Sequence, residues 1–209
     1  MGIPLLEKNH RKDMITIGVL IGIGAVIIEH LYAKWDYWQP IFLFPQFPFE
    51  DFYYGFIFGG VSAELYEIFF KVQDSKKPNH KTHKSIFLVS AVITTLAFAV
   101  LIDLLQHNSI IAHILPPLLI GLIAALLRKD LFAFELANGV LTTLLTFAVF
   151  QILLILYPQL FENHWMLENL TGINFFRIPI EELAFAFSVG FGASCFYEMV
   201  FGYSEVKSK

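Results

Sequence analysis

The stretch Pro48-Phe49-Glu50-Asp51 returns 131 residues later as Pro179-Ile180-Glu181-Glu182, and each copy stands where a long apolar segment begins. The same offset aligns several residues downstream: Phe56 with Phe187, Gly59 with Gly190, Tyr66 with Tyr197 and Glu67 with Glu198. Paired carboxylates at a membrane boundary are costly to maintain. Two copies in one register therefore indicate a duplicated unit that brings four carboxyl groups towards one site.

The composition around these motifs is that of a membrane protein. The chain has 209 residues, of which 56% are hydrophobic and only 15% charged, and the apolar residues occur in blocks rather than in an amphipathic rhythm. A hydrocarbon core of about 30 Å needs roughly 20 helical residues. We therefore predict an all-α, polytopic membrane helical bundle with about six transmembrane helices, and no cleaved signal peptide. The expected spans are Met14–Leu31, Phe49–Val72, Ser85–Leu105, Ile110–Leu127, Leu131–Tyr157 and Ile180–Gly202.

The distribution of basic residues predicts the orientation. Of the 14 lysines and arginines, all but Lys34 and Arg177 fall on one side of the expected spans. The positive-inside rule then places both termini in the cytoplasm of a multi-pass protein of the cell membrane. Both motif helices run in the same direction, which makes the duplication parallel, unlike that of inverted-repeat transporters. The expected repeats are residues 1–106, with the Pro-x-Glu-Asp motif, and residues 107–209, with the Pro-x-Glu-Glu motif.

The four motif acids are the candidate catalytic residues. Proline suits a first helical turn, and acids placed next are stabilised by the helix macrodipole. Two adjacent carboxyl groups can hold one proton between them, and such a pair can protonate a carbon–carbon double bond or take a proton from a carbocation. The alternative reading, which stays open, is simple capping of two helix N-termini. The candidates are Glu50, Asp51, Glu181 and Glu182.

Aromatic residues gather in the two long loops on the non-cytoplasmic side, residues 32–48 and 158–178, which hold all three tryptophans. They form either an interfacial aromatic belt or a lid for a long apolar substrate, and these two interpretations are compatible. Glu64 lies deeper, and an intramembrane carboxylate is a functional candidate by default. The candidate substrate-binding residues are Trp35, Trp38, Phe52, Trp165, Phe185 and Glu64.

The remaining residue patterns limit the alternatives. Cys195 is the single cysteine, so no internal disulfide or multi-cysteine metal site is expected. The histidines lack ligand spacing, and no glycine-rich phosphate loop is present. We therefore expect no metal, no cofactor and no nucleic-acid partner.

With these features the chain resembles the lycopene cyclase domain family, in its small integral-membrane, non-flavin type and fused tandem form. The resemblance rests on the two Pro-x-Glu-(Glu/Asp) motifs, the aromatic loop ahead of each, and the Tyr-Glu that closes each motif helix. It implies a proton-initiated, redox-neutral cyclisation of a carotenoid end group to a β-ionone ring. The four motif acids would act as acid and base, with no assignment among them, and the partners would be a long polyene or isoprenoid and membrane lipid.

A second function remains open from the sequence. The chain could be a non-catalytic isoprenoid- or lipid-binding protein or a small membrane transporter. Glu64, Asp103 and a kink at Pro116-Pro117 would then line a path through the bundle.

Overall fold

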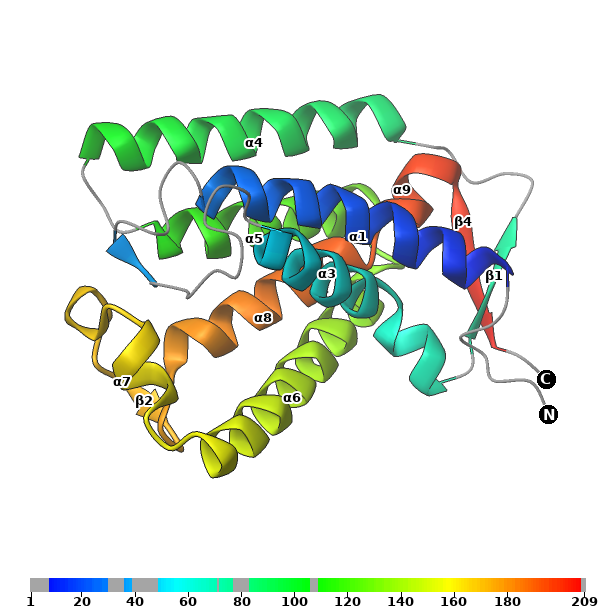
Figure 1. Ribbon diagram of the computed structural model, residues 1–209. Coiled ribbons are helices and arrows are strands. Elements are labelled where there is room, and N and C mark those ends of the chain that lie inside the picture. The colour runs from blue at the N-terminus through cyan, green and yellow to red at the C-terminus, as the bar shows by residue number, and fades with distance from the viewer. Residues whose placement is uncertain are drawn as a thin grey trace.

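The computed structural model describes residues 8–29, 36–38, 49–70, 72–76, 83–105 and 109–207. Trp35, one of the predicted substrate contacts, lies outside the described residues. The described part is all-helical apart from four short strands (Figure 1). The helices are α1 (Lys8–Ile28), α3 (Phe49–Phe70), α4 (Lys84–Leu105), α5 (Ile110–Leu127), α6 (Phe132–Leu156), α7 (Leu160–His164), α8 (Ile180–Ala193), α9 (Phe196–Phe201) and a 3₁₀ turn at Leu167–Asn169.

The helices correspond to the expected apolar blocks, with one difference. The last block is still one stretch long enough to span a membrane, but the structure interrupts its helix at Ser194 and Cys195, between α8 and α9. The Cys195 thiol bonds to the carbonyl oxygen of Gly192 at 3.3 Å, and the Ser194 hydroxyl bonds to that of Phe191. Side chains that bond to the preceding turn compete with regular helix geometry, which gives a physical reason for the break.

Two stretches of the described chain are long and apolar enough to cross a membrane, Phe132–Leu156 and Ile180–Phe201. The first of these stretches has few buried residues, whereas the second lies mostly in the interior. On α6, Ile155 is 79% exposed and Leu156 is 75% exposed. An apolar helix with so few buried residues presents a large apolar surface, which is suited to contact with lipid. The six-span bundle stays a prediction.

The first half of the molecule is built on close packing of α1 against α3. A Cβ atom at Gly18 would lie 2.6 Å from the carbonyl oxygen of Phe56, and one at Gly22 would lie 2.9 Å from that of Phe52. Only glycine permits two helix backbones to approach this closely, as in small-xxx-small helix pairs of membranes. The Phe52 ring therefore lies on the face of α3 that packs against α1.

The second half repeats this packing between α6 and α8. A Cβ atom at Gly139 would meet the ring of Phe187 at 2.9 Å and its carbonyl oxygen at 3.1 Å. Phe187 is the residue that the motif offset aligns with Phe56. The same glycine-on-phenylalanine contact thus holds both helix pairs together, although the two contacting residues are 38 positions apart in the first half and 48 in the second.

A small sheet joins the C-terminal ends of the two motif helices. Strand β1 (Val72–Lys76) follows α3, strand β4 (Tyr203–Lys207) follows α9, and the two strands pair antiparallel. Asp74 lies opposite Glu205, which is 131 positions later. A two-fold rotation that exchanges the strands generates this register. Because α3 and α8–α9 both end at this sheet, they run in the same direction, and their acidic first turns lie towards the other end of the bundle (Figure 1).

Candidate functional site

A tight hairpin positions the second acidic motif. Strands β2 (Asn174–Phe175) and β3 (Ile178–Pro179) pair directly before α8. The two turn residues, Phe176 and Arg177, have positive φ angles of 49° and 71°, a conformation that is costly for non-glycine residues. The hairpin is fastened to α6 because the Gln151 amide donates to the Phe176 carbonyl oxygen at 3.0 Å. The strained backbone of the hairpin turn therefore lies immediately before the second acidic motif, and contacts with α6 hold it in place.

Glu182 accepts two hydrogen bonds on a single carboxylate oxygen. Its Oε1 accepts a hydrogen bond from the Tyr37 hydroxyl and another, at 2.7 Å, from the Trp165 indole nitrogen. Glu182 and Tyr37 are both buried, at 4% and 8% exposure. Two donors on one oxygen stabilise the ionised carboxylate and fix its direction. Tyr37 belongs to the aromatic loop of the first half, so the two halves share this carboxyl group.

Glu181 is held differently. Its Oε1 accepts a hydrogen bond from the Thr171 backbone nitrogen at 2.7 Å, and the side chain is 7% exposed. Its Oε2 is buried and has no hydrogen-bond partner among the described residues. One oxygen thus anchors Glu181 to the loop.

The first acidic motif opens α3. Asp51 is 4% exposed, and its Oδ2 has no hydrogen-bond partner in the described part of the chain. Its charged neighbours are the carboxyl groups of Glu29 and Glu50, which lie within electrostatic range. Three carboxyl groups gathered in a buried position repel one another when all are ionised.

An aromatic pair connects Glu29 of the first half with Glu182 of the second motif. The Trp38 indole nitrogen donates to Glu29 Oε2 at 2.7 Å, and the Trp38 and Trp165 rings lie 5.6 Å apart between centroids. The backbones also pair there, since Trp38 and Trp165 form an isolated β-bridge and the Met166 nitrogen donates to the Tyr37 carbonyl oxygen at 2.9 Å. Each tryptophan therefore holds a carboxylate of one half while contacting the tryptophan of the other half.

Aromatic rings pack against one another beside these acids. Phe58 of α3 stacks on Phe185 of α8 at 5.5 Å, and Phe185 meets the His113 ring of α5 at 5.9 Å. His113 in turn lies 5.7 Å from Tyr37. The run of rings continues from the shared carboxylate into the interior between α3, α5 and α8. Of the predicted substrate-binding set, Phe185 belongs to this run, and Trp38 and Trp165 bond to the carboxyl groups of Glu29 and Glu182. Phe52 lies in the α1–α3 contact instead.

The loop segment 36–38 is fastened at its start. Asp36 accepts hydrogen bonds from the backbone nitrogen of Ser109 at 2.7 Å and from its hydroxyl at 2.6 Å. The Asn169 amide donates to the Asp36 carbonyl oxygen at 2.8 Å. These contacts explain how a loop residue, Tyr37, can be directed at Glu182.

A second group of buried polar side chains lies nearer the other end of the motif helices. It contains Glu64, the deeper carboxylate singled out from the sequence, which is 4% exposed. Asn138 is fully buried and joins three helices: its amide donates to the Ser62 and Gly190 carbonyl oxygens at 2.6 Å each and accepts from the Tyr66 nitrogen at 2.9 Å. Glu64 lies 13 residues after Asp51 on α3, about 20 Å along the helix axis, so it is separate from the acidic first turn of that helix.

Among the described residues, no group of three or more histidine, cysteine, aspartate or glutamate side chains is arranged to hold a metal ion. Cys195 is a buried free thiol in the apolar cluster with Phe87, Ala124, Leu131 and Met199. It acts there as a packing residue.

Comparison with known proteins gives one match. Residues 107–200 match the family model described as lycopene cyclase, which confirms the resemblance to the lycopene cyclase domain family for this part of the chain. The matched segment contains the second acidic motif and the whole of α5, α6 and α8. No curated protein and no solved structure matches the chain.

Two site residues were not among the candidates from the sequence. Tyr37 was one of several aromatic residues in its loop, and nothing in its spacing separates it from its neighbours. Glu29 lies directly after α1, at the end of a long apolar segment. Its position could have marked Glu29 as a site candidate, because ionisable groups beside an apolar span are costly.

Proposed function

We propose that this chain is an integral-membrane carotenoid cyclase, an isomerase that closes the end group of a linear polyene into a β-ionone ring. The observation that carries the proposal is the shared carboxylate Glu182, which is buried and held by donors from both halves beside a run of aromatic rings. The match to the lycopene cyclase family over residues 107–200 supports the same chemistry. The six-span topology with cytoplasmic termini belongs to this proposal.

The reaction needs an acid and a base but no electron transfer. A proton adds to the terminal double bond and leaves a carbocation. The electron pair of a neighbouring double bond then closes the ring and moves the positive charge to a ring carbon. A base removes an adjacent proton and leaves the ring double bond, so atoms and electrons balance without a cofactor.

The contacts of the two motifs support different roles. Asp51, buried among the carboxyl groups of Glu29 and Glu50, is suited to hold and donate the proton. Glu182 accepts two hydrogen bonds on one oxygen, which fix its direction and favour its ionised form, so it is suited to stabilise the cation and take the final proton. We assign Asp51 as the acid and Glu182 as the base, with Glu50 and Glu181 as their adjacent partners.

The surroundings of the acids fit a cationic intermediate. Aromatic faces attract positive charge, and water must be kept away because it would capture the carbocation. The Trp38–Trp165 pair and the Phe58–Phe185 stack supply such faces beside the acids.

The experiment is expression in a host that accumulates lycopene, followed by chromatographic pigment analysis. Wild-type protein is expected to yield cyclic carotenoids, and Glu182→Gln is expected to leave lycopene unchanged. Glu162→Gln, which alters an exposed acid on α7, is the matched control and is expected to behave like wild type. Unchanged lycopene with well-expressed wild-type protein would contradict the proposed substrate.

A transport function has less support. The Asn138 amide closes the space between α3, α6 and α8 with hydrogen bonds to the backbone, so a polar path there would have to break them. The side chain of Asp103, which such a path would use, lies outside the described part of the structure. Proton-coupled solute flux in reconstituted vesicles would favour transport over cyclisation.

A further inference from the structure

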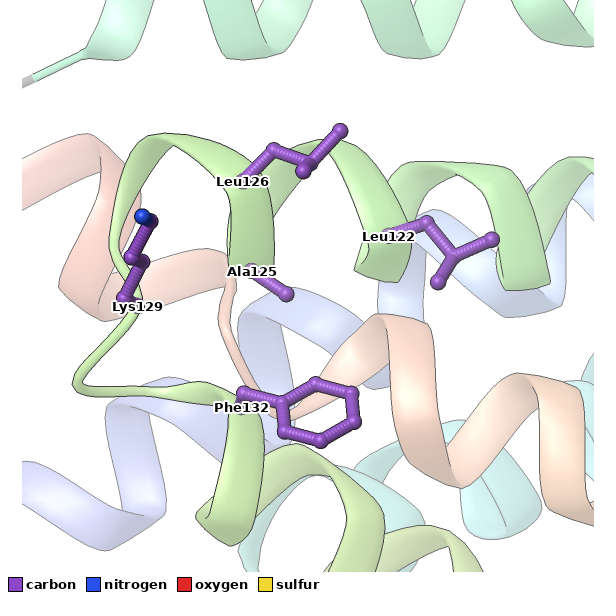
Figure 2. A pocket seen from close by; sticks show the side chains of 5 residues that line it. All are labelled: Leu122, Ala125, Leu126, Lys129 and Phe132. Atoms are coloured by element: carbon purple, nitrogen blue, oxygen red, sulfur yellow. The ribbon is translucent and has the colours of Figure 1, made fainter.

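An apolar groove lies where α5 turns into α6, away from the acidic motifs. Its volume is about 320 Å³, and its lining is almost entirely carbon. Figure 2 shows Leu122, Ala125 and Leu126 projecting from α5 and Phe132 from the start of α6, with Lys129 at one end. Three of these apolar side chains face outward: Leu122 is 40% exposed, Leu126 is 76% exposed and Phe132 is 47% exposed.

The two basic residues of the α5–α6 turn are used differently. Arg128 is 5% exposed and forms a salt bridge with Asp130 at 2.6 Å, and its NH1 donates to the Glu198 carbonyl oxygen at 3.4 Å. Arg128 is therefore committed to the interior. Lys129 is exposed and lines the groove, so its ammonium group is available to an anion outside the protein.

The chemistry of the groove fits one kind of occupant. An outward-facing apolar groove beside a helix end can take an acyl chain, and a lysine at its end can pair with a phosphate. The sequence-based orientation puts this turn at the cytoplasmic leaflet, where anionic lipids supply both groups in one molecule. We infer that the groove formed by Leu122, Ala125, Leu126, Lys129 and Phe132 binds an anionic phospholipid, with one acyl chain in the groove and the headgroup phosphate on Lys129.

Lipid titration of the purified full chain in detergent, followed by native mass spectrometry, tests this inference. Phosphatidylglycerol is expected to bind about fivefold more tightly than phosphatidylcholine, because one lysine near an anionic headgroup is worth about that factor. Lys129→Gln is expected to abolish the preference. Lys84→Gln is the matched control, since Lys84 is an exposed lysine at the start of α4, and it should keep the preference.

Ala125→Phe provides a second variant, because a ring at the groove floor would occupy the space of the acyl chain. It is expected to weaken binding of both lipids while leaving Lys129 in place. Equal binding of the two lipids by wild-type protein would overturn the inference, as would loss of the preference in Lys84→Gln. Displacement of bound phosphatidylglycerol by an equal concentration of geranylgeranyl diphosphate would overturn the choice of occupant. These outcomes do not depend on cyclase activity, because none of the altered residues contacts the acidic motifs.

Discussion

The pairs α1–α3 and α6–α8 share a packing contact but differ in what they bury. Gly18 meets Phe56 in the first pair, and Gly139 meets Phe187 in the second. If these glycines are aligned, Ile17 of α1 corresponds to Asn138 of α6. Ile17 is a buried apolar residue, whereas Asn138 bonds to α3 and α8. At this position the first half therefore packs an apolar side chain, while the second half provides a polar connection between the halves.

The two acidic motifs show the same kind of divergence. In the first, Asp51 lies among other carboxyl groups, and in the second, Glu182 receives hydrogen bonds from Tyr37 and Trp165. Two nearly identical sequence motifs thus differ in what lies next to a buried carboxyl group: other acids in the first, and hydrogen-bond donors in the second. A duplicated acid pair can in this way provide both a proton donor and a proton acceptor.

The strongest test of this difference removes each carboxylate separately. Asp51→Asn and Glu182→Gln are each expected to lower ring formation by roughly 10²- to 10⁴-fold, the usual contribution of a positioned acid or base. The rate of cyclic carotenoid formation in membranes from the lycopene-accumulating host measures the effect. If Asp51→Asn retained full activity while Glu182→Gln did not, the first motif would have no part in proton transfer.

The hydrogen bond between the two halves should have a smaller effect. Tyr37→Phe keeps the ring and removes the donor to Glu182, and a bond to a charged group contributes about 1.5–3 kcal/mol. Activity is therefore expected to fall by roughly 10- to 100-fold, measured by the same pigment assay.

Tyr157→Phe serves as the control for Tyr37→Phe, because its hydroxyl accepts from the exposed Asn163 instead. A Tyr37→Phe protein that is as active as Tyr157→Phe would show that Glu182 does not need the donor. Combining Tyr37→Phe with Glu182→Gln should add little further loss, since both changes act on one interaction.

The glycine contacts are expected to affect stability rather than chemistry. Gly18→Ala and Gly139→Ala each place a methyl group where the facing helix leaves no space, and overpacking typically costs about 1–3 kcal/mol. Both variants should lower the thermal unfolding midpoint in detergent by similar amounts. Gly24→Ala is the control because a Cβ there meets nothing within 4 Å. A large effect in only one half would show that the two contacts are not equivalent.

Much of this architecture follows from the sequence, because apolar block length and the acidic motifs are local signals. The start of α3 at Phe49 and of α8 at Ile180 agrees with the proline that precedes each. The pairing of Tyr37 with Glu182 could not be predicted, since these residues are 145 positions apart. The division between α8 and α9 was also missed, because it depends on side-chain bonds to the preceding turn that leave the apolar pattern unchanged.

A cross-link between β1 and β4 should have the smallest effect on activity, and it tests the two-fold relation between the two motif helices most directly. Asp74→Cys combined with Glu205→Cys places two thiols at directly opposed positions of β1 and β4, and such positions bring Cβ atoms to about 4.5–5.5 Å. Mild oxidation should cross-link them and leave ring formation unchanged, because the sheet lies at the other end of the motif helices from the acids.

Asp74→Cys combined with Val206→Cys is the control for this register. Neighbouring residues of a strand point to opposite faces, so this pair should cross-link poorly. The cross-link is read as a mobility shift in a non-reducing gel, with the single variants, which retain the buried Cys195, run alongside. Preferential cross-linking of Asp74→Cys with Val206→Cys would show that the register of β1 and β4 differs by one residue from the one described here. Positions 131 apart would then no longer face each other, and the two-fold relation between the motif helices would lose its support at this end of the molecule.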